Sequence, residues 1–333
     1  MKPVIICGGV GTKMWPESRP ENPKHFLPLI RGKSLFQLNW ETLRKKFGAN
    51  EIFLQTNSVQ AEIAKKQVPE IVAENIFIEP EMRNQGPATG MAAAMLFKLG
   101  FADEPFILVQ ADVLREPDDK FLEMMEGMDK SIRENGKLMT GGIKPEFAVM
   151  GVDYLVVNNE TKKMEMWLGR GSKEEVEKFL GEGKALIHTN HYAWTPRKML
   201  DCFKIRKPEW YEPLMNIVNG GEVVTEYAKL AKGPIEEVTQ IELLDGYVWE
   251  LPFKWVDFGT WESVANYIGY AEDKAISIDA DNNFVRVPGN KKVALIGVEN
   301  LIVIDSRDGL LICRKDQSGR VGEVVDKLGT KLI

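Results

Sequence analysis

The sequence predicts an α/β protein with a doubly wound, mostly parallel, Rossmann-like sheet, followed by a small all-β domain. Strand-like and helix-like segments alternate through the first 145 residues, which is typical of parallel strands with helices on both faces. After about residue 270 the helical periodicity stops, and short apolar runs separated by Gly, Asn and Asp follow. We therefore expect two domains, residues 1–268 and residues 269–333.

The first domain opens with a buried-strand candidate, VIIC, at residues 4–7. Residues 34–48 are predicted to form the first helix, because Ser34 and Gln37 make a capping box and Gly48 is a stop signal. Strand and helix candidates then alternate. Strands are predicted over 51–57, 75–80, 105–112 and 137–143, and helices over 58–68, 86–100 and about 117–135.

The middle of the chain is mixed, and the end is β-rich. YLVVN (154–158) and MEMWL (164–168) are predicted to pair as strands, and residues 172–183 to form a helix with its own serine cap. Residues 247–261 return to strand character. We expect the tail to coil in layers in the manner of a β-helix. Its strands are predicted over 284–288, 292–298, 300–306 and 309–315.

Composition and charge exclude several classes of partner. The chain has 333 residues and a formal net charge of −6, so no global basic field would attract nucleic acid. Its three cysteines form neither a metal-ligand pattern nor an even disulfide framework, which suits a reducing compartment. The sequence contains neither a signal-peptide core nor an apolar run of membrane-spanning length. We therefore expect a cytoplasmic protein with neither nucleic acid nor membrane as a partner.

A glycine-rich loop, Gly8, Gly9 and Gly11, follows the first strand and admits several interpretations. A P-loop NTPase would need Ser or Thr where Met14 stands, so that interpretation fails. A dinucleotide-binding fingerprint would need a third glycine at the same position and a helix directly afterwards, so it is weakly supported. A tight turn that needs glycine backbone angles is the structural alternative.

Positive charge gathers around the same loop and favours anion binding. Thr12 and Lys13 follow the glycines, and Arg19 and Lys24 lie in the proline-rich excursion after them. Such a loop could wrap a nucleoside triphosphate with its backbone N–H groups while the excursion delivers a second cation.

Three motifs in order carry a family resemblance. They are GGVGTKMWP…NPKHF (8–26), EPEMRNQGPATG (79–90) and WVDFGTW (255–261). The set resembles the sugar-nucleotide pyrophosphorylases, and Trp15 and Phe26 resemble their mannose-1-phosphate guanylyltransferase branch. The resemblance implies a nucleotide-diphospho-sugar transferase fold and an enzyme of the EC 2.7.7 class. Its catalytic domain, residues 1–268, would convert GTP and mannose 1-phosphate into GDP-mannose and pyrophosphate.

The resemblance implies that two lysines and two aspartates perform the nucleotidyl transfer. Two polyanions must meet in this reaction, so cations must offset their repulsion. Lys13 and Lys24 are the implied cations, and Asp112 and Asp257 match the carboxylates that bind the family's metal, here Mg²⁺. Asp112 also ends a predicted strand at the carboxyl edge, where ligands of parallel sheets bind. The alternatives are solvated lysines and a turn-capping aspartate.

The residues implied to bind the nucleotide fall into two groups. The first group is the loop, with Cys7, Gly8, Gly9, Gly11 and Thr12. The second group follows the predicted strand 75–80 and would offer polar groups to guanine and ribose, with a charged surface loop as the alternative. Its members are Glu79, Arg83, Asn84 and Gly86.

The sugar side departs from the family pattern. The family's Y-G-Y segment keeps Gly151 here but has Asp153 at its second glycine. No lysine aligns with the family's sugar-phosphate lysine, and Arg170 or Lys173 is the candidate substitute. Asn190 is the nearest candidate for a contact to a sugar hydroxyl. His188 and His191 are expected to pack or hydrogen-bond rather than to bind a ligand.

Several other functions stay open at this point. They are a pyrophosphorylase for another nucleotide and sugar 1-phosphate, a non-catalytic regulatory subunit that binds nucleotide sugars and, more distantly, a dinucleotide oxidoreductase. Two metal carboxylates favour catalysis, because a pure binder does not need them. In related enzymes such a tail packs on the catalytic domain or joins subunits, so a homodimer is also expected.

Overall fold

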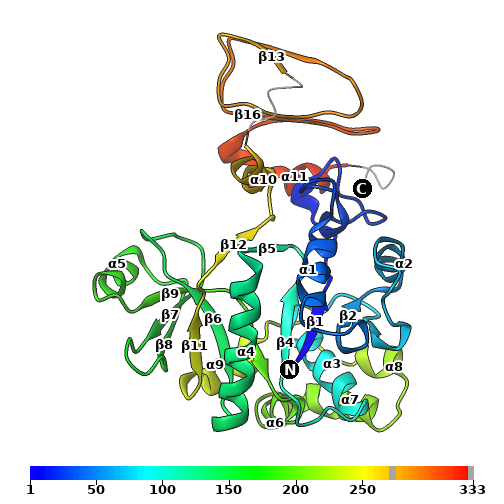
Figure 1. Cartoon of the computed structure of the whole chain (residues 1–333), viewed down its shortest axis with the longest axis vertical. Helices are drawn as coiled ribbons and strands as arrows, with labels where there is room; N and C mark the ends of the chain where they lie inside the picture. The colour runs from blue at the N-terminus through cyan, green and yellow to red at the C-terminus, as the bar shows by residue number, and fades with distance from the viewer. Residues whose placement is uncertain (270–274, 329–333) are drawn as a thin grey trace.

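A computed structural model describes residues 1–269 and 275–328. Its ten-stranded sheet has the order β3-β2-β1-β4-β10-β6-β9-β7-β8, and β11 pairs with β6 (Figure 1). Helices cover the sheet on both faces, as the alternating pattern predicts. The strands are β1 (Lys2–Ile6), β2 (Phe53–Thr56), β3 (Ile76–Ile78), β4 (Phe106–Gln110), β6 (Met139–Ile143), β7 (Tyr154–Val157), β8 (Met164–Gly169), β9 (Ala185–His188), β10 (Ala193–Trp194) and β11 (Tyr247–Glu250).

The sheet is parallel in one half and mixed in the other, so the prediction of a mostly parallel sheet needs correction. β3, β2, β1 and β4 are parallel, and the glycine-rich loop leaves the end of β1. β10 then inserts antiparallel between β4 and β6, and β9, β7 and β8 continue antiparallel. YLVVN and MEMWL pair as predicted, in β7 and β8.

The helices begin largely where their caps predict. Ser34 and Gln37 form the expected capping box at the start of the first helix, which ends at Arg44 rather than at Gly48. Gly90 lies so close to the neighbouring helices that an added Cβ would be 2.6 Å from Leu214. The helices are α1 (Leu35–Arg44), α2 (Ser58–Gln67), α3 (Gln85–Lys98), α4 (Asp118–Asn135), α5 (Lys173–Gly181), α6 (Pro196–Arg206), α7 (Pro208–Val218), α8 (Val223–Tyr227), α9 (Glu236–Leu244), α10 (Trp261–Ile268) and α11 (Val321–Val325).

A separate antiparallel ribbon joins two distant segments. The strand-like stretch 247–261 divides at Pro252 into β11 of the main sheet and β12 (Lys254–Asp257). β12 pairs with β5 (Val113–Glu116), a strand that the sequence analysis missed between strand 105–112 and the next helix. This ribbon brings the segment that carries the third motif to the end of β4.

The tail forms the predicted β-helix-like coil. β13 (Ala275–Ile278) pairs in parallel with β15 (Val293–Ile296), and β14 (Phe284–Arg286) with β16 (Leu301–Asp305). Both registers pair residue i with residue i+18, because Ala275 faces Val293 and Phe284 faces Ile302. β17 (Leu310–Arg314) then returns antiparallel to β16. The unpredicted short helices η6 (Lys315–Arg320) and α11 close the coil. The boundary at 268/269 stays a prediction.

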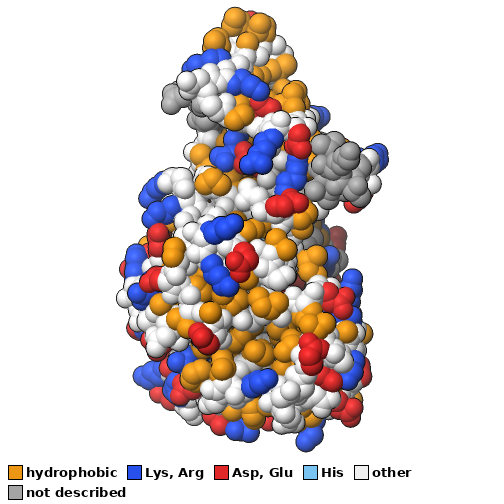
Figure 2. All heavy atoms as spheres, turned by 90° about the vertical axis from the view of Figure 1, so that its right-hand side faces the viewer, with side chains coloured by type: hydrophobic (Ala, Val, Ile, Leu, Met, Phe, Trp, Pro, Cys, Tyr) orange, Lys and Arg blue, Asp and Glu red, His pale blue; other side chains and the backbone are white. Residues whose placement is uncertain are grey.

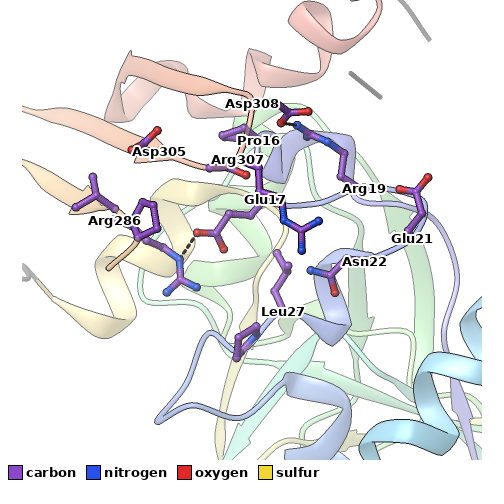
Figure 3. Close-up of a pocket in the computed structure, with 14 residues that line it drawn as sticks. Pro16, Glu17, Arg19, Glu21, Asn22, Leu27, Arg286, Asp305, Arg307 and Asp308 are labelled. Atoms are coloured by element: carbon purple, nitrogen blue, oxygen red, sulfur yellow. Dashed lines mark hydrogen bonds and ion pairs between the residues drawn. The ribbon is translucent and has the colours of Figure 1, made fainter. Parts of the chain in front are cut away.

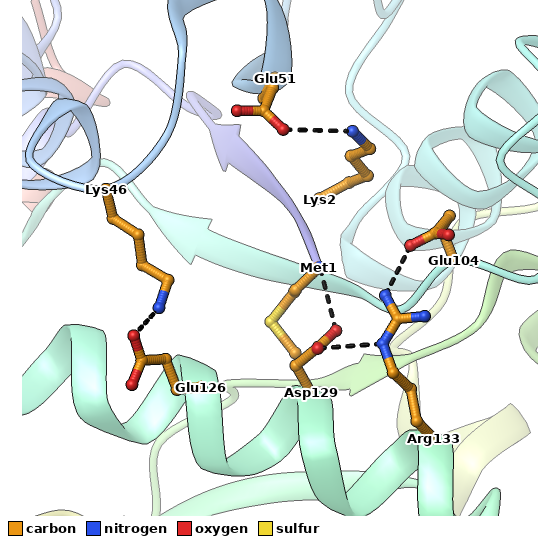
Figure 4. A network of polar contacts seen from close by, with 8 residues as sticks. All are labelled: Met1, Lys2, Lys46, Glu51, Glu104, Glu126, Asp129 and Arg133. Carbon is orange, nitrogen blue, oxygen red and sulfur yellow. Dashed lines mark hydrogen bonds and ion pairs between the residues drawn. The ribbon is translucent and has the colours of Figure 1, made fainter.

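The start of β1 is held by an ion-pair network on α4. The amino group of Met1 lies 2.9 Å from Asp129, and Arg133 contacts both Asp129 and Glu104 (Figure 4). The Arg133–Glu104 pair is exposed and contributes little individually, but the network ties the first strand to the longest helix. Figure 2 shows positive and negative side chains interspersed on the face in view. Among the described residues, no helix is both long and apolar enough to span a membrane.

Candidate functional site

The glycine-rich loop is shaped to let a lysine cross it. Gly9 and Gly11 adopt left-handed backbone angles, with φ of 73° and 81°, which favour glycine. A Cβ on Gly11 would lie 2.6 Å from Cγ of Lys24. The backbone N–H of Lys24 also donates to the carbonyl of Val10, at 3.2 Å. Gly11 is therefore required for the close approach of Lys24 to the loop.

Lys24 and two aspartates meet where the ribbon joins the sheet. Nζ of Lys24 lies 2.5 Å from Oδ2 of Asp112, which follows the carboxyl end of β4. Asp257 faces Val113 in the ribbon, and the N–H of Phe258 donates to the carbonyl of Asp112 at 3.2 Å. Three of the four residues expected to be catalytic therefore form one cluster. The fourth, Lys13, is exposed on η1 (Thr12–Met14), with its charge acting on Asp257.

The pKa values of the two carboxyl groups are shifted in opposite directions. Burial alone would raise the pKa of Asp112, but the charge and hydrogen bond of Lys24 bring this pKa below its ordinary value. Partial withdrawal from water, and then the negative charge of Asp112, raise the pKa of Asp257. Although burial opposes it, the charges of both aspartates raise the pKa of Lys24. The site therefore holds one well-compensated carboxylate and one carboxylate that lacks full compensation.

These aspartates fit a magnesium ion. Mg²⁺ takes one or two carboxylates and completes its shell with substrate phosphates and water, so it needs no dense protein cage. Within 1–269 and 275–328, no group of three or more His, Cys, Asp and Glu side chains could hold a metal. Burial first, and then the charge of Asp112, raise the pKa of Asp257, and a divalent cation bound between the two carboxylates would favour the charged form of Asp257.

A cavity of about 400 Å³ extends from Asp112 and the loop toward the second motif. Gly8, Gly9 and Asp112 line one part, and Glu79 and Asn84 line another. Its remaining lining residues are Ile6, His25, Met82, Gln85, Ala88, Thr89, Leu108 and Gln110. Residues from motifs that are far apart in the sequence therefore share one hollow at the carboxyl ends of β1 and β4.

The polar groups of the second motif are held by specific contacts. Glu79 accepts a hydrogen bond from the hydroxyl of Tyr227 at 2.6 Å, and burial raises the pKa of Glu79. Asn84 caps α3 by accepting from the N–H of Gln85 at 2.7 Å, with a φ of 71°. Such pre-set groups can orient a bound base or ribose without a further entropy cost.

Several residues predicted to bind nucleotide do not line this cavity. The Cys7 side chain is buried in the main core, and its N–H donates to the carbonyl of Gln55. Gly86 faces Trp210, which would lie 2.6 Å from an added Cβ. Arg83 contacts Glu81 and the carbonyl of Leu230. The contacts of these three residues contribute to packing and loop shape, and their role in nucleotide binding stays a prediction. Gly11 and Thr12 belong to the loop beside the cavity.

The sugar-side candidates divide into two places. Asn190 is next to the cavity, because its carbonyl accepts from Nε2 of Gln110 at 2.7 Å. Its own side-chain Oδ1 is buried and has no hydrogen-bond partner among the described residues. Asp153 and Arg170 instead face each other at 3.7 Å, and Gly151 adopts a φ of 82° in the preceding turn.

Four polar residues of the cavity wall were not predicted from the sequence as site residues, namely His25, Gln85, Thr89 and Gln110. His25 lies inside the PKHF motif beside Lys24, so its position was the signal. Its Nε2 lies 3.2 Å from Oε1 of Gln60, and burial lowers its pKa to about 4. Gln110 is held by Arg115, whose guanidinium donates to Oε1 at 2.7 Å. Only the fold reveals this second arrangement.

His188 and His191 pack and hydrogen-bond as expected, and they make acid stability a testable property. Nε2 of His188 lies 2.8 Å from Oγ1 of Thr140, and burial lowers its pKa to about 3. Burial also lowers the pKa of His191 well below its ordinary value. As the pH falls, the two histidines therefore become protonated in the unfolded chain before they do so in the folded protein. The stability associated with each neutral ring is complete above about pH 6.5 and is lost as the pH falls.

We expect acidification from pH 7 to pH 4 to remove about 3 kcal/mol of unfolding free energy through His188 alone. Urea unfolding of the protein and of His188→Gln at both pH values measures this. The variant should lose less stability on acidification than the unchanged protein. Equal losses in both would contradict the assignment of His188 as a neutral, buried ring.

Comparisons with known proteins agree with this arrangement. Residues 2–273 match the family described as nucleotidyl transferase, and residues 273–328 match the MannoseP isomerase/GMP-like beta-helix domain. The chain therefore belongs to the mannose-1-phosphate guanylyltransferase family of sugar nucleotidyltransferases, in which a nucleotidyl transferase domain is followed by a β-helix domain. The resemblance carried by the three motifs and the α/β fold class are thereby confirmed.

Individual relatives cover nearly the whole chain. The mannose-1-phosphate guanylyltransferase of Klebsiella pneumoniae is 26% identical, with 98% of this chain and 73% of the relative aligned. The xanthan biosynthesis protein XanB of Xanthomonas campestris is 25% identical over the same shares. A crystal structure from Thermus thermophilus, titled mannose-1-phosphate geranyltransferase, superposes with a TM-score of 0.86 at 24% identity and 98% coverage of both chains. The last likeness shows the fold.

Proposed function

We propose that this protein is a mannose-1-phosphate guanylyltransferase that forms GDP-mannose and pyrophosphate from GTP and mannose 1-phosphate. The observation that carries the proposal is the contact of Lys24 with Asp112, beside Asp257, at the edge of the cavity. A cation and two metal-binding carboxylates thus adjoin a pocket with polar groups for a nucleoside. The names of the Klebsiella and related proteins support the choice of guanine and mannose.

In the proposed reaction a phosphate oxygen of the sugar attacks the α-phosphorus of GTP, and pyrophosphate leaves. Lys24 and Lys13 would offset the charge of the two polyanions. Asp112 and Asp257 would hold Mg²⁺, which supplies Lewis-acid stabilisation of the phosphoryl oxygens when bound. Backbone N–H groups of the glycine-rich loop would face the phosphates. Glu79 and Asn84 would orient the base and ribose at the other end of the cavity.

The alternatives differ in what they leave unexplained. A dinucleotide oxidoreductase would need a helix directly after the glycine loop, whereas only the 3₁₀ turns η1 and η2 (Lys24–Phe26) follow it before α1 begins at Leu35. A regulatory subunit is favoured by the ion pair between Asp153 and Arg170. In this pair the candidate cation for the sugar phosphate, Arg170, is already engaged by a carboxylate. Catalysis is favoured over this alternative because Asp112 and Asp257 are placed together. A cytoplasmic location and a homodimer stay predictions.

The decisive assay is pyrophosphate release with Mg²⁺ and GTP across a panel of sugar 1-phosphates, with ATP, UTP and dTTP as controls. Release that requires both GTP and mannose 1-phosphate is expected. Release with another nucleotide or sugar would move the protein to a different specificity within the same class. Silence across the panel, with GDP-mannose still binding, would indicate a regulatory subunit.

A further inference from the structure

The segment between the two active-site lysines is packed on the C-terminal β-helix. Ten residues separate Lys13 from Lys24. Buried side chains of this segment and its continuation join those of the tail in a second core, distinct from the core of the main sheet. This second core includes Met14, Trp15 and Leu27 together with Ile302, Ile304 and Val321. The chain that carries the lysines therefore leaves the sheet after β1 and takes its support from the tail.

The fit between the segment and the tail is closest at one glycine. Gly309 lies in the turn between β16 and β17, where an added Cβ would be 2.7 Å from Cζ2 of Trp15 and 2.8 Å from Cβ of Pro16. Ordinary carbon contacts lie at about 3.5–4.0 Å. The carbonyl of Trp15 also accepts a hydrogen bond from Nε1 of Trp261 at 2.9 Å. The segment is thus held between the tail and α10.

Two ion pairs join the segment to the tail. Arg286 of β14 contacts Glu17 at 2.6 Å, and Arg19 contacts Asp308 at 2.9 Å. Figure 3 shows these pairs reaching across a hollow of about 960 Å³ between the proline-rich segment and the β-helix. Partly exposed pairs contribute little to stability, but two pairs on one short segment restrict where it can lie.

We propose that the turn at residues 306–309 and the two ion pairs position the active-site lysines, so that the β-helix is a working part of the active site. Lys24 contacts Asp112 at 2.5 Å although the two residues are 88 positions apart in the sequence. A long loop without support would sample many conformations in which this contact is not made. Displacement of a catalytic group by about 1 Å can lower a rate by about 10²-fold. The proposal rests on the proposed function, because it concerns the same lysines.

The test is Gly309→Ala, with Gly319→Ala as its matched control. Gly319 belongs to η6 of the same tail, and an added Cβ there has nothing within 4 Å. Gly309→Ala must push Trp15 and Pro16 away by about 1 Å. At an assay temperature well below the melting temperature, kcat is therefore expected to fall about 10-fold to 100-fold. The control should keep kcat within about two-fold. Adding Trp15→Phe removes the ring atoms nearest the new methyl group and should restore part of kcat.

A purely structural role predicts a different pattern. In that case Gly309→Ala would lower the melting temperature and leave kcat of the folded protein unchanged, which would overturn the proposal. Should Gly309→Ala fail to fold, Glu17→Gln combined with Asp308→Asn removes both ion pairs without steric change. That variant should lower kcat several-fold at a nearly unchanged melting temperature, and kcat equal to that of the unchanged protein would overturn the proposal.

The same experiment separates this proposal from the proposed function. Absence of pyrophosphate release from the unchanged protein would count against the function alone. Equilibrium binding of GTP would then report the position of the lysines, and weaker binding by Gly309→Ala than by Gly319→Ala would still support positioning by the tail. Equal binding by the two variants would overturn it.

Discussion

Replacing Asp112 with asparagine is expected to lower pyrophosphate release by about 10²-fold to 10³-fold, with the fold retained. Asparagine preserves the shape of the side chain and can still accept from Lys24, so the packing around β4 and β5 should survive. The lost charge removes a proposed ligand for Mg²⁺ and the carboxylate whose pKa Lys24 holds below its ordinary value. Steady-state kinetics at saturating Mg²⁺, with circular dichroism of the variant, measure both effects.

Two companion variants make this result specific. Asp103→Asn removes a carboxylate that pairs with Arg197 at 2.8 Å on the surface, so it should leave turnover unchanged. Asp257→Asn should lower turnover as much as Asp112→Asn, but without lowering the melting temperature, because the raised pKa of Asp257 shows that the fold disfavours its charge. Turnover of either active-site variant equal to that of the unchanged protein would refute its role as a metal ligand.

Replacing Lys24 with methionine is the second large effect that we expect. The ammonium group offsets Asp112 directly and Asp257 through space, so its removal leaves two carboxylates side by side. Turnover should fall by about 10²-fold to 10³-fold, since the same charge would face the phosphates. Without nucleotide, Mg²⁺ should raise the melting temperature of this variant more than that of the unchanged protein, because the carboxylates have lost their cation.

A double variant decides whether the ion acts at these carboxylates. Lys24→Met combined with Asp257→Asn has one carboxylate fewer and should lose the extra stabilisation by Mg²⁺. Equal stabilisation of the single and double variants would show that Mg²⁺ binds elsewhere. A loss of folding in Lys24→Met at all Mg²⁺ concentrations would favour a structural role for the lysine.

The predictable parts of the site are those that depend on neighbouring residues. Gly9 and Gly11 need left-handed angles within a few residues of the strand that they follow, and the capping box at Ser34 is complete in four residues. Asp112 is predictable at a strand end because an apolar run stops there. His25 and Gln110 were not predicted as site residues, because the type of a residue alone does not show that its side chain lines a cavity. Arg83 and Gly86 were predicted to bind nucleotide because they lie in a motif. Neither lines the cavity, since Arg83 contacts the carbonyl of Leu230 and Gly86 lies against Trp210.

By itself the sequence determined the α/β class, the coiled tail, the three motifs and the kinds of side chain that nucleotidyl transfer needs. These depend on periodicity, glycine and proline chemistry, and charge, which act over short stretches. Only the tertiary structure decided that Lys24 reaches Asp112, that an unpredicted ribbon brings Asp257 to the same place, and that the lysine-bearing segment packs on the β-helix. Such meetings depend on strand register and on shared burial of apolar surface between distant segments, which local patterns do not specify.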